Sequence, residues 1–120
     1  MSELEVGVAA AFAADGPLAR AHGRLSPRQG QLDMAVAVAR AIEKGHGLAV
    51  EAGTGVGKTF AYLVPLLLSG RRALLSTATQ ALQDQLFTRD IPAVVRALGL
   101  PVRVALLKGR SSYVCLHRLE

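Results

Sequence analysis

The chain has 120 residues, of which 51% are hydrophobic and only 4% aromatic, and its formal net charge is +5. This length makes one small domain or part of a larger one, and the apolar content can supply a core, which excludes a disordered chain. Few aromatic residues argue against a platform on which exposed bases stack, so any nucleic-acid contact should be mostly with the backbone. The positive charge suits a polyanionic partner, but it is common in ordinary proteins and decides nothing alone.

The single cysteine, Cys115, excludes an intramolecular disulfide. No stretch is long and apolar enough to span a bilayer, so we expect no membrane partner. The alanine-rich run 8–14 follows Glu3 and Glu5, where an export signal carries positive charge. We therefore expect a reducing, cytoplasmic location.

The first predicted helix begins at Ser26-Pro27, a serine N-cap with proline at the first helical position, and ends at Gly45. A short apolar strand is predicted at 47–50, directly after this helix. The helix carries an apolar stripe at helical spacing, made of Leu32, Ala35, Val36, Ala39 and Ile42.

A glycine-rich loop at 51–59 separates this strand from a predicted helix at 59–69. Its glycines let backbone N–H groups approach phosphate oxygens, Lys58 supplies a positive charge, and the Thr59 hydroxyl suits Mg²⁺. The Walker A pattern has glycine where this chain has Ala52, a small change. A glycine-rich turn that binds nothing is the alternative, but strand, loop and helix occur in the required order. We expect ATP and Mg²⁺ here, with Lys58 and Thr59 catalytic. The expected nucleotide-binding residues of the loop are Ala52, Gly53, Thr54, Gly55, Val56, Gly57, Lys58, Thr59 and Phe60.

The helix after the loop contains Pro65, which should bend or end it near 61–64 because proline removes a hydrogen bond of the helix. A second buried strand is predicted at 73–76. Thr77 or Thr79 then caps a helix that reaches about residue 87.

Asp90 and Pro92 begin a further helix, which Gly99 ends. A third strand is predicted at 102–107, and a last helix starts at Ser111 or Ser112. Asp84 and Asp90 are expected to be solvated or capping residues. The alternation of helices with fully apolar strands predicts an α/β fold, a parallel sheet with helices on both faces.

Together these motifs resemble superfamily-two helicases, and most closely the YoaA/DinG branch of the XPD-like helicases, from about residue 12 to residue 120. The matching segments are Phe12-Ala13-Ala14-Asp15-Gly16 with Leu18, Val36-Ala37-Val38, Ala41-Ile42-Glu43-Lys44-Gly45, the phosphate loop, Ala81-Leu82-Gln83-Asp84-Gln85-Leu86 and Leu107-Lys108-Gly109-Arg110-Ser111. The resemblance implies part of a RecA-like P-loop NTPase domain. It also implies an iron-sulfur DNA helicase that couples ATP hydrolysis to movement along single-stranded or forked DNA, usually 5′ to 3′, in repair or replication.

In this interpretation residues 1–20 are a lead segment, 21–110 the first part of the motor domain, and 111–120 the start of the iron-sulfur region. No Asp-Glu-x-His segment or arginine finger is present, and phosphoryl transfer needs both an acidic metal holder and such an arginine. We therefore expect the 120 residues to bind nucleotide without turning it over.

The resemblance also assigns roles to single residues. Arg28 and Gln31 match the element whose glutamine amide pairs with adenine. An amide suits this role because it offers both the donor and the acceptor that adenine recognition needs. Thr77, Gln83 and Gln85 match a motif that contacts the DNA backbone without reading sequence. A solvated helix surface for the glutamines and for Arg28, and a helix cap for Thr77, remain the alternatives.

Lys108 and Arg110 follow the third predicted strand and match a further DNA-contacting segment, although a charged turn is usually just solvated. Cys115 matches the first of the cysteines that hold a 4Fe-4S cluster in this family. Such a cluster needs four thiolates and this chain has one, so a small buried hydrophobe is the alternative for Cys115.

Two other functions remain open from sequence. A nucleotide kinase would share the phosphate loop but lack the glutamine-bearing and Thr-x₄-Leu-Gln-x-Gln elements. A truncated, non-catalytic module that binds nucleic acid or a protein partner would retain the loop only as a relic.

Overall fold

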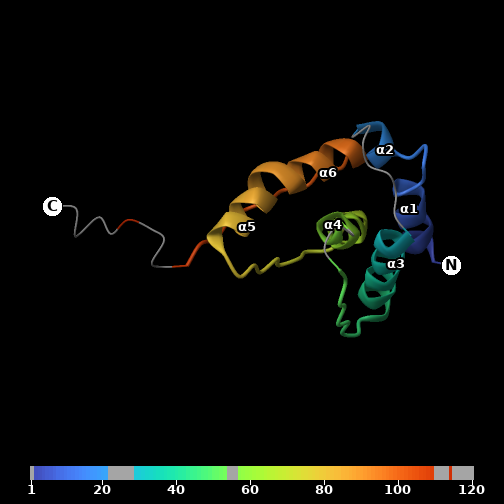
Figure 1. The fold of residues 1–120 in the computed structure, drawn as a ribbon, viewed down its shortest axis with the longest axis horizontal. Coiled ribbons are helices and arrows are strands. Elements are labelled where there is room, and N and C mark those ends of the chain that lie inside the picture. Colours follow the sequence, from blue (N-terminus) through green and yellow to red (C-terminus); the bar gives the residue numbers. More distant parts are fainter. Residues whose placement is uncertain (1, 22–28, 54–56, 110–113, 115–120) are drawn as a thin grey trace.

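The computed structural model describes residues 2–21, 29–53, 57–109 and 114. Its elements are helical: α1 (Glu3–Ala11), α2 (Pro17–Ala21), α3 (Gln29–Lys44), α4 (Lys58–Leu68), α5 (Gln80–Gln85), η1 (Leu86–Asp90) and α6 (Ile91–Leu98). Figure 1 shows α4 nearly end-on, between α3 and the continuous rod made by α5, η1 and α6. The helix that carries the end of the phosphate loop is therefore central to the fold.

The core is built around α4. Leu63 and Val64 of this helix are fully buried, together with Val8 of α1 and Val94 of α6. The most extensive packing in the molecule is between α3 and α4. The buried positions of α3 include Ala35 and Ala39, whose small side chains allow close approach of the two helices.

Several predicted helix boundaries are confirmed. Gly45 and Gly99 follow the ends of α3 and α6 with φ of 68° and 65°, a left-handed conformation that favours glycine. Thr79 caps α5, since its hydroxyl accepts a 3.2 Å hydrogen bond from the N–H of Leu82. The predicted cap at Ser26-Pro27 lies outside the described residues, as does the helix expected from Ser111 or Ser112.

Pro65 was predicted to bend or end its helix near 61–64, and the ending is wrong, because α4 continues through Pro65 to Leu68. Proline removes only one N–H from the helix, and the Pro65 ring is fully buried in the core, which offsets that loss. The end of α4 is closed by Ser69, whose hydroxyl donates a 2.6 Å hydrogen bond to the carbonyl of Leu66.

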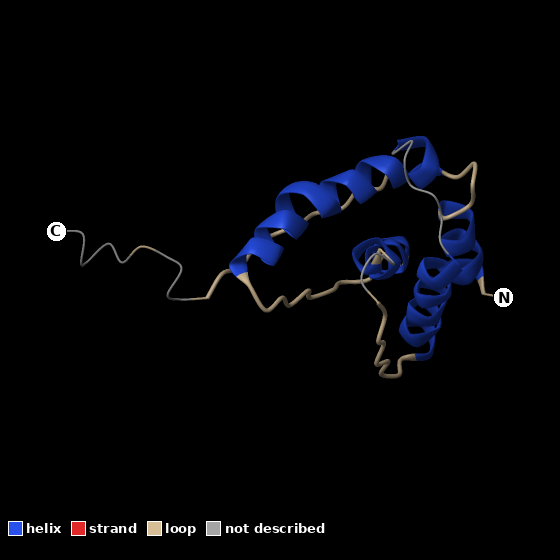
Figure 2. Ribbon diagram, viewed as in Figure 1, coloured by secondary structure: helices blue, strands red, loops and turns tan. Residues whose placement is uncertain are grey.

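The three predicted strands are not formed in the part of the chain that the structure describes, where 47–50, 73–76 and 102–107 are extended loops (Figure 2). Their apolar side chains lie largely in solvent: Leu74 is 91% exposed and Leu107 81%. A strand exists only with a neighbouring strand that pairs with its N–H and C=O groups, and no segment among the described residues supplies that pairing. The expected parallel sheet is thus absent from the described residues.

An open pocket of about 660 Å³ lies between segments 71–77 and 101–107 and is also lined by α4 and the start of the rod. Its apolar lining includes Leu63, Leu67, Leu75, Leu86 and Val104. Among the described residues, no helix has the length and apolar character needed to cross a membrane.

Candidate functional site

The phosphate loop ends at the N-terminus of α4. Gly57 is the residue before this helix, with φ 80° and ψ 47°, and Lys58 is its first residue. Gly57 and Lys58 are both exposed, and Thr59 is half-buried. The first N–H groups of a helix have no partner within the helix and its N-terminus carries positive partial charge, so this position suits phosphate. Thr54, Gly55 and Val56 lie outside the described residues.

Gln31 packs directly on the end of this loop. Its Nε2 donates a 3.1 Å hydrogen bond to the carbonyl oxygen of Gly57, and only 5% of the residue is exposed. A Cβ atom at Gly57 would meet this amide, which would have to shift, and the positive φ of Gly57 by itself favours glycine. The alternative of a solvated surface glutamine is therefore wrong.

The remaining predicted nucleotide-binding residues differ in environment. Ala52 is half-buried and, like every described residue other than glycine, has a negative φ, so alanine in place of the Walker A glycine carries no backbone strain here. Gly53 is exposed, and Phe60 is half-buried against the core. Arg28 lies outside the described residues.

A second polar group surrounds Thr59. The Tyr62 side chain, one turn further along α4, is hydrogen-bonded to that of Thr59. Burial raises the pKa of the Tyr62 hydroxyl and the nearby charge of Asp90 raises it further, while the hydrogen bond with Thr59 lowers it. Asp90 was expected to be a solvated or capping residue, but it is only 6% exposed and its side chain caps no backbone N–H. Tyr62 and Asp90 lie on different helices, so no local sequence pattern predicts the effect of the Asp90 charge on Tyr62.

The predicted DNA-contacting residues gather around α5. Gln83 Nε2 donates a 2.9 Å hydrogen bond to the carbonyl of Leu107, and Lys108 Nζ lies 3.2 Å from Asp84 Oδ1. The Thr77 hydroxyl donates to the carbonyl of Thr79 at 3.2 Å, so the residue that caps α5 is Thr79.

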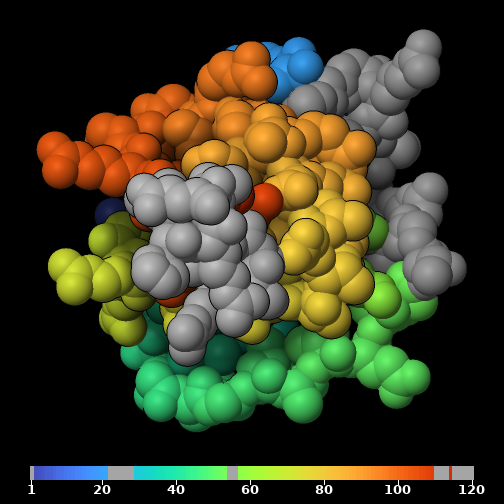
Figure 3. Space-filling view, turned by 90° about the vertical axis from the view of Figure 1, so that its left-hand side faces the viewer, coloured from blue at the N-terminus to red at the C-terminus, as the bar shows by residue number. Residues whose placement is uncertain are grey.

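Figure 3 shows α5, in yellow, on the same face as the segment that precedes the phosphate loop, in green at its lower edge. Gln85 lies exposed on α5. Arg110 and Cys115 lie outside the described residues, and no cluster of three or more His, Cys, Asp or Glu residues suited to a metal occurs within the described ones. Of the predicted DNA-contacting residues that the structure describes, Gln83 and Gln85 thus lie on α5, Thr77 lies just before it, and Lys108 lies beside it on the segment 101–109.

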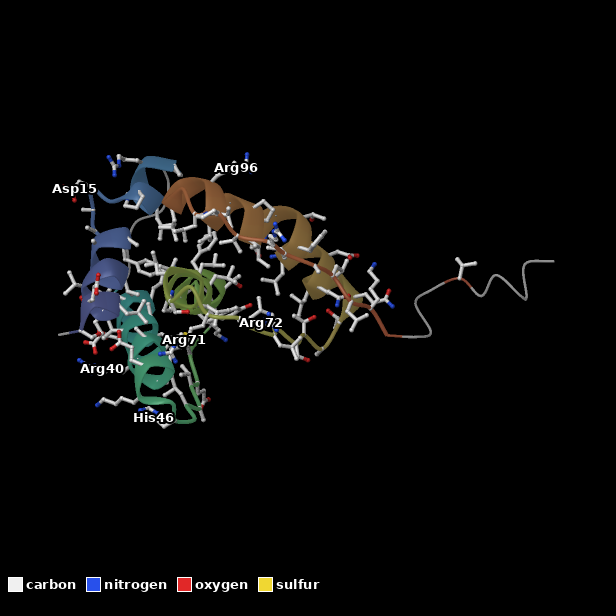
Figure 4. The ribbon with its side chains drawn as sticks, turned by 180° about the vertical axis from the view of Figure 1, so that it is seen from behind. Asp15, Arg40, His46, Arg71, Arg72 and Arg96 are labelled. Carbon is white, nitrogen blue, oxygen red and sulfur yellow. The ribbon has the colours of Figure 1, made fainter. Side chains whose placement is uncertain are left out.

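Other basic residues have structural partners. Arg71 Nη1 donates a 2.8 Å hydrogen bond to the carbonyl of Ile42, near the C-terminus of α3 where a cation is favoured, and Arg40 Nε lies 3.2 Å from Glu5 Oε1. Figure 4 shows Arg40 and Arg71 beside α3. These residues contribute to the positive charge of the chain but hold helices together.

A helix N-terminus with an exposed lysine, preceded by a glycine with positive φ that contacts a buried glutamine, is the arrangement expected of a P-loop nucleotide site. The chain belongs to the DEAD/DEAH box helicase family, which matches residues 33–117. It is 58% identical over 109 residues to ATP-dependent DNA helicase YoaA of Escherichia coli K12, covering 91% of this chain and 17% of that protein.

Two further relatives are also similar over most of this chain and over a small share of their own length. The YoaA helicase of Haemophilus influenzae is 48% identical over 118 residues, covering 98% of this chain and 18% of the relative. The ATP-dependent helicase DinG of Mycobacterium tuberculosis H37Ra is 50% identical over 101 residues, covering 78% and 15%. The chain thus spans less than a fifth of the length of these relatives. No solved structure matches it.

Proposed function

We propose that the chain is the nucleotide-binding N-terminal part of an ATP-dependent DNA helicase that moves along single-stranded or forked DNA, 5′ to 3′, in repair or replication. The observation that carries the proposal is the phosphate loop at α4, where Gln31 holds Gly57 beside the exposed Lys58. Relatives named as ATP-dependent DNA helicases support it. Bacterial relatives that act on DNA support a cytoplasmic location.

Each residue at the site has a distinct chemical role in this proposal. Lys58 places its ammonium group against the β- and γ-phosphates, and N–H groups of the loop and of α4 bind phosphate oxygens. The Thr59 hydroxyl would hold Mg²⁺, which would neutralise phosphate charge when bound. The Gln31 amide has a second N–H and a carbonyl oxygen with which to pair an adenine edge, with Arg28 beside it in sequence.

In the full-length protein, we propose that 47–50, 73–76 and 102–107 pair in the parallel sheet of a RecA-like domain, with helices on both faces. Their apolar side chains and the pocket of about 660 Å³ between two of them support this. In this arrangement 1–20 form a lead segment, 21–110 begin the motor domain and 111–120 begin an iron-sulfur region.

The nucleotide site is tested by Lys58→Ala in the full-length protein. We expect ATPase and unwinding to fall by about a hundredfold or more, because a preorganised charge at the phosphates is lost, while single-stranded DNA still binds. The matched control is Lys44→Ala, which removes an exposed lysine at the end of α3 and should leave turnover intact. Normal turnover in Lys58→Ala would contradict the assignment.

The same variant separates the remaining alternatives. The family match decides against a nucleotide kinase. A non-catalytic module would bind DNA equally well in wild type and Lys58→Ala and would bind no nucleotide in either.

We also propose that Cys115 is one of four ligands of a 4Fe-4S cluster in the full-length protein. The resemblance supports this, and four thiolates are what such a cluster needs. Cys115→Ser should lower the iron content and the brown absorbance of the purified protein, because one thiolate ligand of the cluster is lost. An unchanged iron content in Cys115→Ser would instead support the alternative that Cys115 is a small buried hydrophobic residue.

For DNA, we propose contacts from Thr77, Gln83, Gln85, Lys108 and Arg110 to phosphates and sugars. Hydroxyl and amide donors bind the backbone without reading sequence, which suits a strand that must slide. Gln83 is hydrogen-bonded to Leu107, and Lys108 is paired with Asp84 of the same helix as Gln83. These two contacts support a common binding surface.

A further inference from the structure

An exposed arginine and an exposed glutamine share one buried carboxylate in the α5–η1–α6 rod. Asp90 is only 6% exposed, and its Oδ1 lies 3.1 Å from Nε of Arg89. Its other oxygen, Oδ2, accepts a long hydrogen bond of 3.5 Å from Nε2 of Gln85. Because a buried charge is costly without partners, Asp90 favours the conformations in which both donors stay beside it. The carboxylate thus holds Gln85 and Arg89 next to one another.

The backbone places these side chains on the same side of the rod. Gln85 and Arg89 are four positions apart, which is the spacing of neighbours on a helix surface. Gln85 and Asp90 are five positions apart. They meet in η1, where the N–H of Ile91 bonds the carbonyl of Leu86 with the spacing of a π turn. Turns of this kind are frequent at functional sites.

The outer edge of the Arg89 guanidinium faces away from the core. The Arg89 side chain is 68% exposed, whereas that of Asp90 is 9% exposed, so the arginine forms the outer half of the pair. Its Nε donates to Asp90, and no other described residue is hydrogen-bonded or ion-paired to its two terminal nitrogens. Two terminal nitrogens in this fork can bind a phosphate through two parallel hydrogen bonds.

The surrounding surface carries proposed DNA contacts but little positive charge. Among the proposed DNA contacts that the structure describes, Lys108 is the only cation, and it is paired with Asp84. Arg89 lies on the same rod, one turn beyond Gln85, and outside the segment 81–86 that carries the family resemblance. It therefore adds a cation at the place where a polyanionic backbone would lie.

We propose that Arg89 is a further DNA-binding residue, which contacts a phosphate of the single strand beside the contact of Gln85 and is positioned by Asp90. This proposal rests on the proposed function. Nε of Arg89 stays on Asp90 while the terminal nitrogens donate to phosphate oxygens, so the buried carboxylate fixes the direction of the fork. The uncharged amide of Gln85 beside the fork favours a sugar-phosphate backbone over an acidic protein segment, and neither group reads the base sequence.

The test is the salt dependence with which the full-length protein binds an oligothymidine, measured by fluorescence anisotropy. Arg89→Ala should weaken binding about three- to fivefold and lower the slope of log affinity against log salt by about 0.7, because one phosphate contact is lost. Arg89→Lys should keep the wild-type slope, since the charge remains, but should lose part of the affinity with the fork. A merely structural role of Arg89 would lower the affinity of Arg89→Ala and leave its slope unchanged, and that result overturns the proposal.

Arg96→Ala is the matched control, since Arg96 is another exposed arginine of the rod, and its Nε donates to the carbonyl of Pro92 on its own helix. It should keep the wild-type affinity and slope.

If Arg89→Ala fails to fold because Asp90 loses its ion-pair partner, the double variant Arg89→Gln/Asp90→Asn decides the question, since it leaves no unpaired buried charge. It should show the same reduction in slope, and a wild-type slope in it overturns the proposal. A full-length wild-type protein that binds no oligothymidine would instead contradict the proposed function.

Discussion

At the residue scale, the contact between Gln31 and Gly57 indicates why glycine is favoured at position 57, the last glycine of the phosphate loop. Gly57→Ala would place a methyl group against the Gln31 amide and would also hold an L-residue at φ 80°. The left-handed conformation alone costs about 1–2 kcal/mol, and displacement of Gln31 adds the loss of its hydrogen bond to the loop. We expect nucleotide affinity in the full-length protein to fall by about tenfold or more, measured by fluorescence titration.

Gly45→Ala is the control for this prediction, because Gly45 has a φ of 68° and open space where a Cβ would lie. It should lower stability through backbone strain alone and leave nucleotide affinity unchanged. Equal nucleotide affinities in the two variants would mean that the contact with Gln31 does not shape the loop.

At the element scale, helix boundaries could be predicted from the sequence, whereas the predicted strands are not formed in the described residues. Gly45, Thr79 and Gly99 act locally through φ and capping, so sequence alone identifies them. The helices α1 and α2 were missed, since the run Glu3–Ala11 is apolar almost throughout and shows no polar face.

The phosphate loop was predicted from its spacing, whereas the role of Gln31 came from the resemblance. The Gln31 side chain is buried because α3 packs against α4, whereas the alternative of a solvated helix surface expects it to be exposed. The burial of Asp90 depends on the packing of helices distant in sequence and therefore required the structure.

The ion pair between Asp84 of α5 and Lys108 of the segment 101–109 predicts how DNA affinity is tuned. Asp84 competes with DNA phosphate for Lys108, so Asp84→Asn should strengthen binding of single-stranded DNA by a few-fold. Lys108→Ala should weaken it and lower the slope of log affinity against log salt by about 1. Binding titrations at several salt concentrations measure both effects.

Arg96→Ala is the control, because Arg96 lies on α6, away from α5 (Figure 4), and its Nε donates to the carbonyl of Pro92 on the same helix. It should leave the salt slope unchanged. In the Lys108→Ala background, Asp84→Asn should have no effect, and a persistent gain there would show that Asp84 acts on DNA by another route.

At the scale of the whole molecule, the described residues bury a helical core yet leave apolar, extended segments in solvent. Leu74 and Leu107 are 91% and 81% exposed, on either side of a pocket of about 660 Å³. Unpaired apolar segments of this kind associate with one another. We therefore expect the isolated 120 residues to be poorly soluble and to unfold over a broad temperature range, as measured by circular dichroism and light scattering.

Leu74→Lys should reduce the scattering of the isolated chain, because the added charge opposes association, but it should destabilise the full-length protein, where the same position is buried in the proposed sheet. A sharp, cooperative transition of the isolated wild-type chain would show instead that these residues form a complete folding unit without the sheet.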